Sequence, residues 1–423
     1  MKVYVLGLGH IGLPLAVFLG LKGFEVVGID KDKELIREIT ENKVNIYEKY
    51  GERHIGDLAQ QLIKEGIFKV SDLLIRDDLS PGVFLVTVGI SDSGEGKYDL
   101  SPLQEVTDLL ASKLVEGDIV IFKTTMIPGT FEKLILPRLN ALGFKVYLAY
   151  CPETIAEGAA FLELQNNPRI LAAADDISYE KAAEFLRSVS DSPIYRASNI
   201  RTAEAVKVVQ NVFRDVNIAL INELTYIAGS LNIDIYELRY LANTHPRVFL
   251  HEPGPGVGGY CLPNALGYLR ESLPEEEKRC LRLSSLARKI NKERPGEVVK
   301  FVTEALQKAG KEIKGAKIAI IGLAMKDYCA DVRCSPAADI ADILLRLGAE
   351  VRGYDPLVPQ IYVYQVATFE ECIKGADCMI IAAKQENMNF NSEDIVNLMN
   401  EPPVVVDTRR DFPEIPGIKV YRI

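Results

Sequence analysis

Short apolar runs alternate with longer amphipathic stretches in the first part of the chain. The run KVYVLG at residues 2–7 is followed by a helical pattern, PLAVFLGLKG, and by a second short run, FEVVGID, which ends at Asp30. Strand, helix and strand in this order predict a parallel sheet with right-handed crossovers. The same rhythm continues through VFLVTVG, DIVIFKTT and KVYLAYCPE to about residue 190. We therefore predict a doubly wound α/β domain over residues 1–198.

A different pattern begins at Asn199. From there to about Gly229, apolar residues recur at three- and four-residue spacing, which is typical of one long helix. Helical segments continue to about residue 308, interrupted by the loop HEPGPGVGGYCLPN, and alternation returns in KIAIIGLA, DCMIIAA and PPVVVDTR. The prediction is an α/β protein in which a central long-helix region, residues 199–308, joins the first domain to a smaller doubly wound domain, residues 309–423.

A glycine turn follows the first predicted strand. Its members, in the pattern GLGHIG, are Gly7, Gly9, His10, Ile11 and Gly12. Between a strand and a helix, such glycines permit a tight turn, a close approach of the backbone to a pyrophosphate and the packing of helix on strand. Asp30 ends the next strand, where a carboxylate accepts hydrogen bonds from ribose hydroxyls and repels a 2′-phosphate. The pattern predicts a Rossmann domain that binds NAD; a glycine turn that merely packs is the alternative.

Length, net charge and cysteine content indicate which partners and which cellular compartment to expect. A length of 423 residues exceeds what one hydrophobic core normally supports, and a net charge of −10 argues against a nucleic-acid partner. There is no leader-like segment and no apolar run of the roughly 20 residues that cross a bilayer, so we expect no membrane association. Seven scattered cysteines without a CxxC pair, and four histidines, favour a reducing cytoplasm and no metal site.

The stretch GPGVGGYCLP carries the strongest chemical signal. Glycines at 254, 256, 258 and 259 let the backbone lie against a ligand directly before Cys261. A thiol at that position is poorly shielded, so it is available to attack a carbon atom of the ligand. A lone cysteine is otherwise an inert small apolar residue. In a chain that binds NAD, we interpret Cys261 as a nucleophile.

The chain resembles the UDP-glucose/GDP-mannose dehydrogenase family along essentially its whole length, and within it the branch that acts on UDP-N-acetylhexosamines. The motifs that carry the resemblance are GLGHIGLPLA, KTTMIPGT at 123–130, CPETIAEG at 151–158, AEAVKVVQNVFRDVNIALINEL at 203–224, HPRVFLHEPGPGVGGYCLP at 245–263 and GLAMKDYCADVRCSP at 322–336. The resemblance implies a four-electron, NAD-dependent oxidation of the C6 hydroxyl of a UDP-sugar, in particular UDP-N-acetyl-D-mannosamine, to a uronic acid for a surface polysaccharide or glycoprotein glycan. The Cys261 thiolate would form first a thiohemiacetal and then a thioester.

The resemblance also implies roles for single residues. The catalytic positions are Cys261, Lys207 and Asn211 as donors to the C6 oxygen, Glu153 as general base through water, and Thr125, which positions that water and the nicotinamide. Further NAD contacts are Thr87, Glu157 and Arg333. The substrate contacts beyond Glu153, Lys207 and Asn211 are Gly256, Gly258, Lys326 and Arg247, which would reach the substrate of the partner subunit in a homodimer.

Simpler interpretations stand beside these roles. Lys207 and Asn211 fit a solvated helix stripe, and Arg247 fits a surface arginine. Glu153 after Pro152 fits a carboxylate at the start of a helix. The sequence departs from the family at Ala265, where an aspartate is usual. Asn264 is adjacent but neutral, and on extended backbone it would point the other way.

Further departures from the family's usual residues are Tyr260 and Cys334, and none of the three departures removes a hydride-transfer group. Loss of the aspartate at 265 favours a nucleotide-sugar-binding paralogue with impaired turnover. A two-electron dehydrogenase of the hydroxyacid type shares the Rossmann and helical architecture, but it needs neither the Cys261 loop nor a second α/β domain. A four-electron dehydrogenase is the interpretation that explains the most motifs of the sequence.

Overall fold

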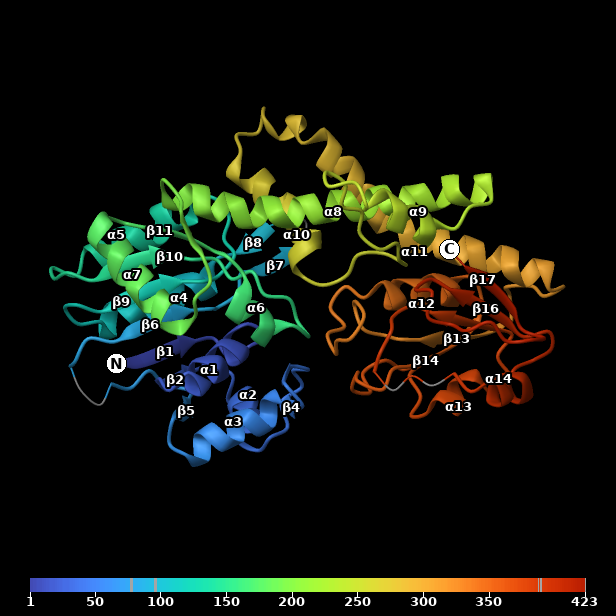
Figure 1. The fold of residues 1–423 in the computed structure, drawn as a ribbon, viewed down its shortest axis with the longest axis horizontal. Coiled ribbons are helices and arrows are strands. Elements are labelled where there is room, and N and C mark those ends of the chain that lie inside the picture. The colour runs from blue at the N-terminus through green and yellow to red at the C-terminus, as the bar shows by residue number, and fades with distance from the viewer. Residues whose placement is uncertain (77–78, 95–96, 387, 389, 423) are drawn as a thin grey trace. The chain divides into compact units, whose positions relative to one another are not determined.

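The structure is a computed structural model that describes residues 1–76, 79–94, 97–386, 388 and 390–422. The chain divides into two compact units (Figure 1). The first unit contains Met1–Gln210 and Gly267–Pro274, and the second contains Asn211–Leu266 and Glu275–Ile423. The boundary after Gln210 lies within α8 (Ile200–Leu231), the long helix that the sequence predicts.

The first unit contains an eight-stranded sheet in the described chain. Its strands, in spatial order, are β12 (Ile194–Arg196), β11 (Arg169–Ala173), β10 (Tyr147–Tyr150), β9 (Ile119–Phe122), β6 (Val83–Val86), β1 (Lys2–Leu6), β2 (Glu25–Ile29) and β5 (Phe68–Ser71). Neighbouring strands are parallel except β10 and β11. Two short hairpins are β3 (Lys49–Tyr50) with β4 (Arg53–His54), and β7 (Ser91–Gly94) with β8 (Lys97–Asp99).

Helices cover this sheet because its central strands are apolar on both faces. β6 and β9 are buried at every residue, which is typical of a parallel sheet between helical layers. The helices are α1 (Gly12–Leu21), α2 (Lys33–Thr40), α3 (Ile55–Lys64), α4 (Ser101–Lys113), the π-helical turn η1 (Phe131–Ile135), α5 (Leu136–Asn140), α6 (Ala160–Asn166) and α7 (Asp176–Val189). Asp32 caps α2 by accepting hydrogen bonds from the backbone amides of Glu34 and Leu35.

The second unit begins with the helical region. After its part of α8 come α9 (Ile235–Ala242), the first half of α10 (Cys261–Ser272), the 3-10 turn η2 (Lys278–Cys280) and α11 (Arg282–Lys308). From Gly267 onward, α10 belongs to the first unit. Although α8 has 32 residues, neither it nor any other described helix has an apolar stretch long enough to cross a bilayer. A loop of residues 243–260 connects α9 to α10 and carries the glycine-rich motif.

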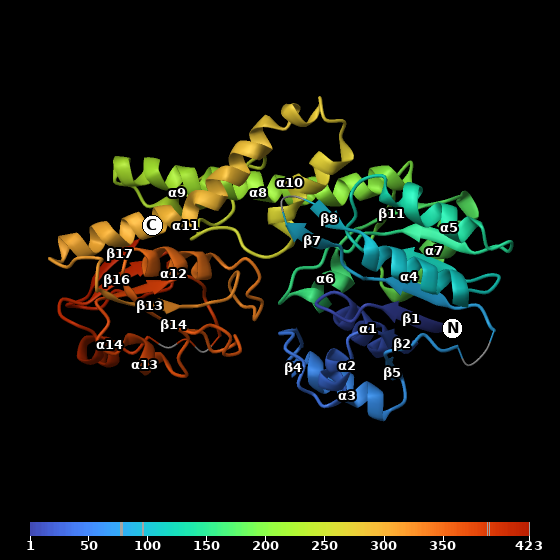
Figure 2. The same cartoon turned by 180° about the vertical axis from the view of Figure 1, so that it is seen from behind.

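A five-stranded, wholly parallel sheet follows in the second unit. Its order is β14 (Glu350–Tyr354), β13 (Lys317–Ile321), β15 (Cys378–Ile381), β16 (Val404–Asp407) and β17 (Lys419–Arg422). Ile318 and Ile320 of β13 pack in one apolar cluster with α11 and α12 (Pro336–Arg346). Figure 2 shows these two helices on one side of the sheet. Ala319 and Ile321 face the opposite cluster with α13 (Phe369–Ile373) and α14 (Ser392–Leu398). This alternation fixes helices on both faces, so the predicted α/β fold with two Rossmann-like sheets is confirmed.

Candidate active site

The residues predicted in the first unit gather at one edge of its sheet. Gly7 follows β1, Asp30 follows β2, Thr87 follows β6, Thr125 follows β9 and Glu153 follows β10. These five strands are parallel, so their carboxyl ends meet at the same edge. The chain order reverses between β1 and β6, and ligands of open α/β sheets bind at such a switch point.

The glycine turn has the geometry that a dinucleotide needs. Gly7 has φ +95°, a conformation that favours glycine. A Cβ atom at Gly12 would lie 1.7 Å from the carbonyl oxygen of Gly7, so the helix can begin here only without a side chain. At Gly9 a Cβ atom would meet nothing within 4 Å, which leaves the backbone bare. The turn and the start of α1 therefore fit the pyrophosphate of NAD.

Two side chains, those of Asp30 and Thr87, form hydrogen bonds with the backbone in and next to this turn. Asp30 accepts hydrogen bonds from the backbone N–H of Leu8 at 2.7 Å and of Asp32 at 3.0 Å, one on each carboxylate oxygen. The hydroxyl oxygen of Thr87 lies 3.0 Å from the carbonyl oxygen of Leu6 and 2.8 Å from that of Gly7. Each Asp30 oxygen keeps a further lone pair, so the carboxylate remains able to accept from a ribose hydroxyl.

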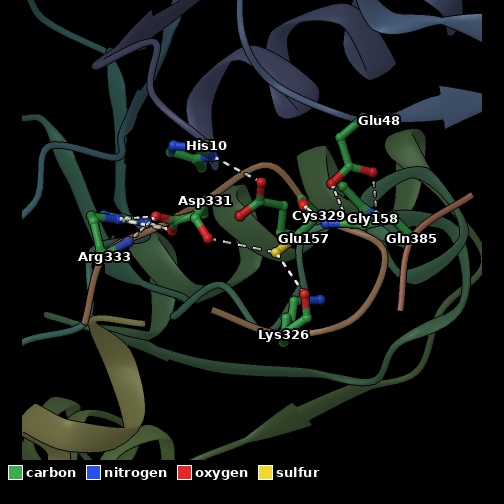
Figure 3. A network of polar contacts seen from close by, with 10 residues as sticks. His10, Glu48, Glu157, Gly158, Lys326, Cys329, Asp331, Arg333 and Gln385 are labelled. Carbon is green, nitrogen blue, oxygen red and sulfur yellow. Dashed lines mark hydrogen bonds and ion pairs between the residues drawn. The ribbon is translucent and has the colours of Figure 1, made fainter. Parts of the chain in front are cut away.

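The segment CPETIAEG lies next to the turn and is tied in place by a buried acid. The Nδ1 atom of His10 lies 3.4 Å from Oε1 of Glu157, and the two side chains point toward each other (Figure 3). Glu48 accepts hydrogen bonds from the backbone amides of Gly158 at 2.6 Å and Ala160 at 3.0 Å, and it is 1% exposed. The sequence analysis gave Glu48 no role, since its partners are 110 and 112 residues away.

The predicted base Glu153 lies against a lysine that the sequence analysis did not single out. Lys123 Nζ is 3.0 Å from Glu153 Oε2. Burial opposes the charge of Glu153, but the charge and hydrogen bond of Lys123, together with smaller contributions from the Thr154 N–H and Arg169, lower the pKa of the carboxyl below its ordinary value. The alternative that Glu153 starts a helix is wrong, because the next helix, α6, begins only at Ala160. Thr125 is half-buried, two residues after Lys123.

A second buried acid fixes the loop that carries Thr125. Glu204 is fully buried and accepts hydrogen bonds from the backbone amides of Gly129 at 2.6 Å and Phe131 at 2.9 Å. Burial, which outweighs these two bonds, raises the pKa of Glu204 to about 7. Glu204 lies one helical turn before Lys207 on α8. The same helix therefore positions Lys207 and holds the Thr125 loop.

In the second unit, Cys261 is the exposed first residue of α10. The glycine loop before it lies directly on the segment between β13 and α12. Gly259 N–H donates to the carbonyl oxygen of Arg333 at 2.8 Å, and a Cβ atom at Gly258 would lie 2.7 Å from the carbonyl oxygen of Cys334. A side chain at Gly258 would push these two segments apart. Because Gly258 allows this close contact, it helps to fix where α10 starts and therefore where the Cys261 thiol lies.

The backbone around Ala265 differs from our expectation. The extended conformation assumed for residues 261–265 is wrong, because α10 already starts at Cys261. Asn264 and Ala265 lie three and four residues after the thiol, hence both about one helical turn along. Ala265 is 2% exposed, and the side-chain amide of Asn264 donates to the carbonyl oxygen of Tyr260 at 2.9 Å. This turn offers no carboxylate beside the thiol.

The two residues predicted from the C-terminal domain lie on one loop between β13 and α12 (Figure 3). Arg333 forms an ion pair with Asp331, with 2.5 Å between Nη2 and Oδ2. The carbonyl oxygen of Lys326 accepts from the Cys329 thiol at 3.4 Å, and Gln385 Nε2 donates to the Cys329 carbonyl at 2.7 Å. The loop is therefore braced from within, while the side chain of Arg333 remains 52% exposed.

The remaining predicted residues lie on α8 and on the loop after α9. Asn211 is 4% exposed, so the solvated-stripe alternative is wrong for it, and Lys207 is half-buried. Arg247 is exposed on the loop that leads to α10. Gly256, on the same loop, has φ +153°, and a Cβ atom there would lie 3.1 Å from Pro336. The structure thus brings the predicted residues together as two groups, one in each unit.

The fold and the site define a class. A Rossmann sheet with a bare glycine turn and a supporting aspartate, in one chain with an exposed cysteine at a helix start, is typical of a dehydrogenase that can form a covalent intermediate.

The chain belongs to the UDP-glucose/GDP-mannose dehydrogenase family. Residues 1–189 match the NAD binding domain of this family, residues 201–293 its central domain and residues 319–413 its UDP binding domain. The chain is therefore an NAD-dependent nucleotide-sugar dehydrogenase, as the sequence analysis predicts.

Several relatives are similar over nearly their full length. A UDP-N-acetyl-D-mannosamine dehydrogenase of Pyrococcus horikoshii is 36% identical over 427 residues, which covers 100% of this chain and 98% of the relative. One of Methanocaldococcus jannaschii is 34% identical, covering 99% and 96%. The solved structure of the P. horikoshii enzyme has a TM-score of 0.88 and covers 99% of both chains at 34% identity. A UDP-N-acetyl-mannosamine dehydrogenase from Staphylococcus aureus gives 0.84 at 29% identity, covering 100% and 98%.

Proposed function

We propose that this enzyme oxidises the C6 hydroxyl of UDP-N-acetyl-D-mannosamine to the carboxylate, with Cys261 as covalent nucleophile. The observation that carries the proposal is the exposed Cys261 thiol at the first residue of α10, behind a loop whose glycines pack on the β13–α12 segment. The match to a UDP binding domain supports a uridine nucleotide, and the names of the two archaeal relatives support this particular sugar.

The reaction proceeds in two oxidations followed by a hydrolysis. NAD, when bound, accepts the hydride that leaves C6 in each oxidation. In the first oxidation the hydroxyl also loses its proton to water, which gives an aldehyde, and the Cys261 thiolate adds to its carbon to form a thiohemiacetal. Loss of the second hydride leaves a thioester. Water then forms the new C–O bond as the C–S bond breaks, so that the thiolate is regenerated and the carboxylate is released.

The remaining residues stabilise charge and move one proton. Lys207 and Asn211 donate to the C6 oxygen, which carries negative charge at each tetrahedral stage. Glu153 accepts the proton of the attacking water, which Thr125 holds in place. A carboxylate with a lowered pKa stays ionised at neutral pH and is thus ready to accept that proton at each turnover. Because Ala265 supplies no acid, the water step depends on Glu153.

We propose further that the enzyme works as a homodimer, with a face of α8 and α9 as the contact. Phe213, Leu220 and Ile227 are 57%, 46% and 48% exposed, and their seven-residue spacing places them on one side of α8. Tyr240 on α9 is 71% exposed. A second copy that covers these side chains would let Arg247 reach the substrate of its partner. The seven free thiols support a cytoplasmic location.

The substrate proposal is tested with purified protein, excess NAD and a panel of UDP-hexoses. We expect kcat/KM for UDP-N-acetyl-D-mannosamine to exceed that for UDP-glucose by at least about 100-fold, since a site that binds the acetamido group leaves its polar atoms unpaired with the other sugar. A higher kcat/KM for UDP-glucose, or for UDP-N-acetylgalactosamine, would contradict the choice of sugar.

A further inference from the structure

Two charged side chains meet in the interior of the first unit, at the end of two adjacent strands. Lys123 follows β9 and Glu153 lies three residues after β10, and these strands are in register at Phe122 and Tyr150. The Lys123 and Glu153 side chains are 4% and 10% exposed, with 3.0 Å between Nζ and Oε2. The backbone N–H of Glu153 donates to the carbonyl oxygen of Lys123 at 3.0 Å. The sheet therefore holds this ion pair at a fixed separation.

The surroundings make Glu153 the principal partner of this lysine. The Cys151 thiol lies 4.0 Å from Lys123 Nζ, and burial raises its pKa, so it remains a neutral thiol. Arg169 is also buried, and its positive charge opposes that of Lys123. Among the described groups acting on the pair, only Glu153 therefore provides a negative charge at neutral pH.

Glu153 needs the lysine just as strongly. Burial alone favours the protonated form of a carboxyl group and raises its pKa by several units in fully buried cases. The attraction of Lys123 reverses this effect, with smaller contributions from the backbone N–H of Thr154, 2.9 Å from Oε1, and from Arg169. Removal of the lysine would leave a buried carboxylate without compensation.

We propose that Lys123 is a positioning residue that keeps Glu153 ionised and oriented for the hydrolysis of the thioester. The inference rests on the proposed function, in which water loses a proton to Glu153 as its oxygen bonds to the thioester carbon and the thiolate leaves. Lys123 stays protonated throughout and touches no reacting atom. A lysine that merely stabilises the fold would affect both oxidations and the hydrolysis alike.

The test compares wild-type enzyme with Lys123→Met across pH in single turnovers that separate the first hydride transfer from thioester hydrolysis. We expect the acid limb of the hydrolysis rate to move up by at least about one pH unit, so that at a pH on this limb hydrolysis slows at least about tenfold. The first hydride transfer should keep its pH profile. Lys123→Arg keeps the positive charge, so the acid limb of its hydrolysis rate should lie at the wild-type pH. Cys151→Ala changes the other neighbour of Lys123 Nζ and should also leave the limb at the wild-type pH. An unshifted limb in Lys123→Met overturns the proposal.

A spectroscopic readout tests the same claim without turnover. Infrared spectroscopy at a pH between the acid limbs of the two enzymes should show the C=O stretch of a protonated, buried carboxylic acid in Lys123→Met and not in wild type. The band should vanish in the double variant Lys123→Met/Glu153→Gln, which buries no charge at this pair and is expected to fold even if the single variant does not. If Lys123→Met is unfolded, Lys123→Gln replaces it. Absence of the band in a folded single variant overturns the proposal, whichever sugar the enzyme oxidises.

Discussion

At the scale of residues, the glycines of the turn differ in the reason that a side chain would be unfavourable. Gly12 is required by the protein itself, because a Cβ atom would lie 1.7 Å from the backbone oxygen of Gly7. Gly9 is not required by the protein in this way, because nothing within 4 Å would oppose a side chain, so we expect any requirement for glycine there to come from the ligand. Substitutions at the two positions should therefore differ in their effect on folding and agree in their effect on NAD.

We predict that Gly12→Ala lowers the free energy of unfolding by about 2 kcal/mol or more, since backbone must move to admit the methyl group. Gly9→Ala should leave the free energy of unfolding unchanged and weaken NAD binding at least about tenfold. Urea unfolding and a direct titration with NAD measure the two effects. Wild-type NAD affinity in Gly9→Ala would show that the pyrophosphate does not lie on this turn.

At the scale of elements, the sequence predicts most where one segment determines its own structure. The fully apolar strands β6 and β9 and the long helix α8 follow from local pattern alone. The turn at Gly7 follows from its spacing and from the strand before it. All of these were confirmed. A strand that is buried on both faces is a continuous apolar run in the sequence, and a helix that is buried on one face has apolar residues at three- and four-residue spacing.

Charged groups that are buried between distant segments have no such local sequence pattern. Glu48 bonds to backbone 110 residues away, and Glu204 bonds to backbone 75 residues away. Lys123 lies within a motif that the sequence analysis quoted, but its partner Glu153 is defined by the pairing of β9 with β10. Such contacts come from sheet order, which spacing along the chain does not contain.

The start of α10 is a case in which a local signal was present. Pro263 is the third residue of the helix, and proline is well tolerated in a first turn, where N–H groups have no helical partner. The signal was overlooked in favour of an extended loop. With the helix in place, Asn264 and Ala265 both lie about one turn from Cys261.

At the scale of the whole molecule, the proposed role of Arg247 involves two copies of the chain. The exposed apolar side chains lie on α8 and on α9, and α9 directly precedes the loop of Arg247. If that loop serves the partner subunit, catalysis and assembly depend on the same surface. We therefore expect that dissociation of the dimer would lower the affinity for the sugar nucleotide and leave the NAD turn unaffected.

We predict that Arg247→Ala raises KM for the sugar nucleotide far more than KM for NAD, by about tenfold or more, because a charged contact to substrate is lost. Arg346→Ala, which removes an exposed arginine from α12, is the matched control and should change neither constant. Steady-state kinetics with each substrate varied in turn gives both values.

Mixing variants tests whether Arg247 acts across the interface. A Cys261→Ser subunit retains its arginine and an Arg247→Ala subunit retains its thiol. If the arginine acts in trans, subunit exchange between the two variants restores low-KM activity that neither has alone. No recovery after exchange would place Arg247 in its own subunit's site or outside any site.

The central claim is a four-electron oxidation through a covalent bond to Cys261, and the most direct measurement is the number of NADH molecules formed per sugar consumed. The account predicts two NADH per UDP-N-acetyl-D-mannosamine with excess NAD, and none beyond a first oxidation in Cys261→Ser. One NADH per sugar in the wild-type enzyme, or two in Cys261→Ser, would contradict it.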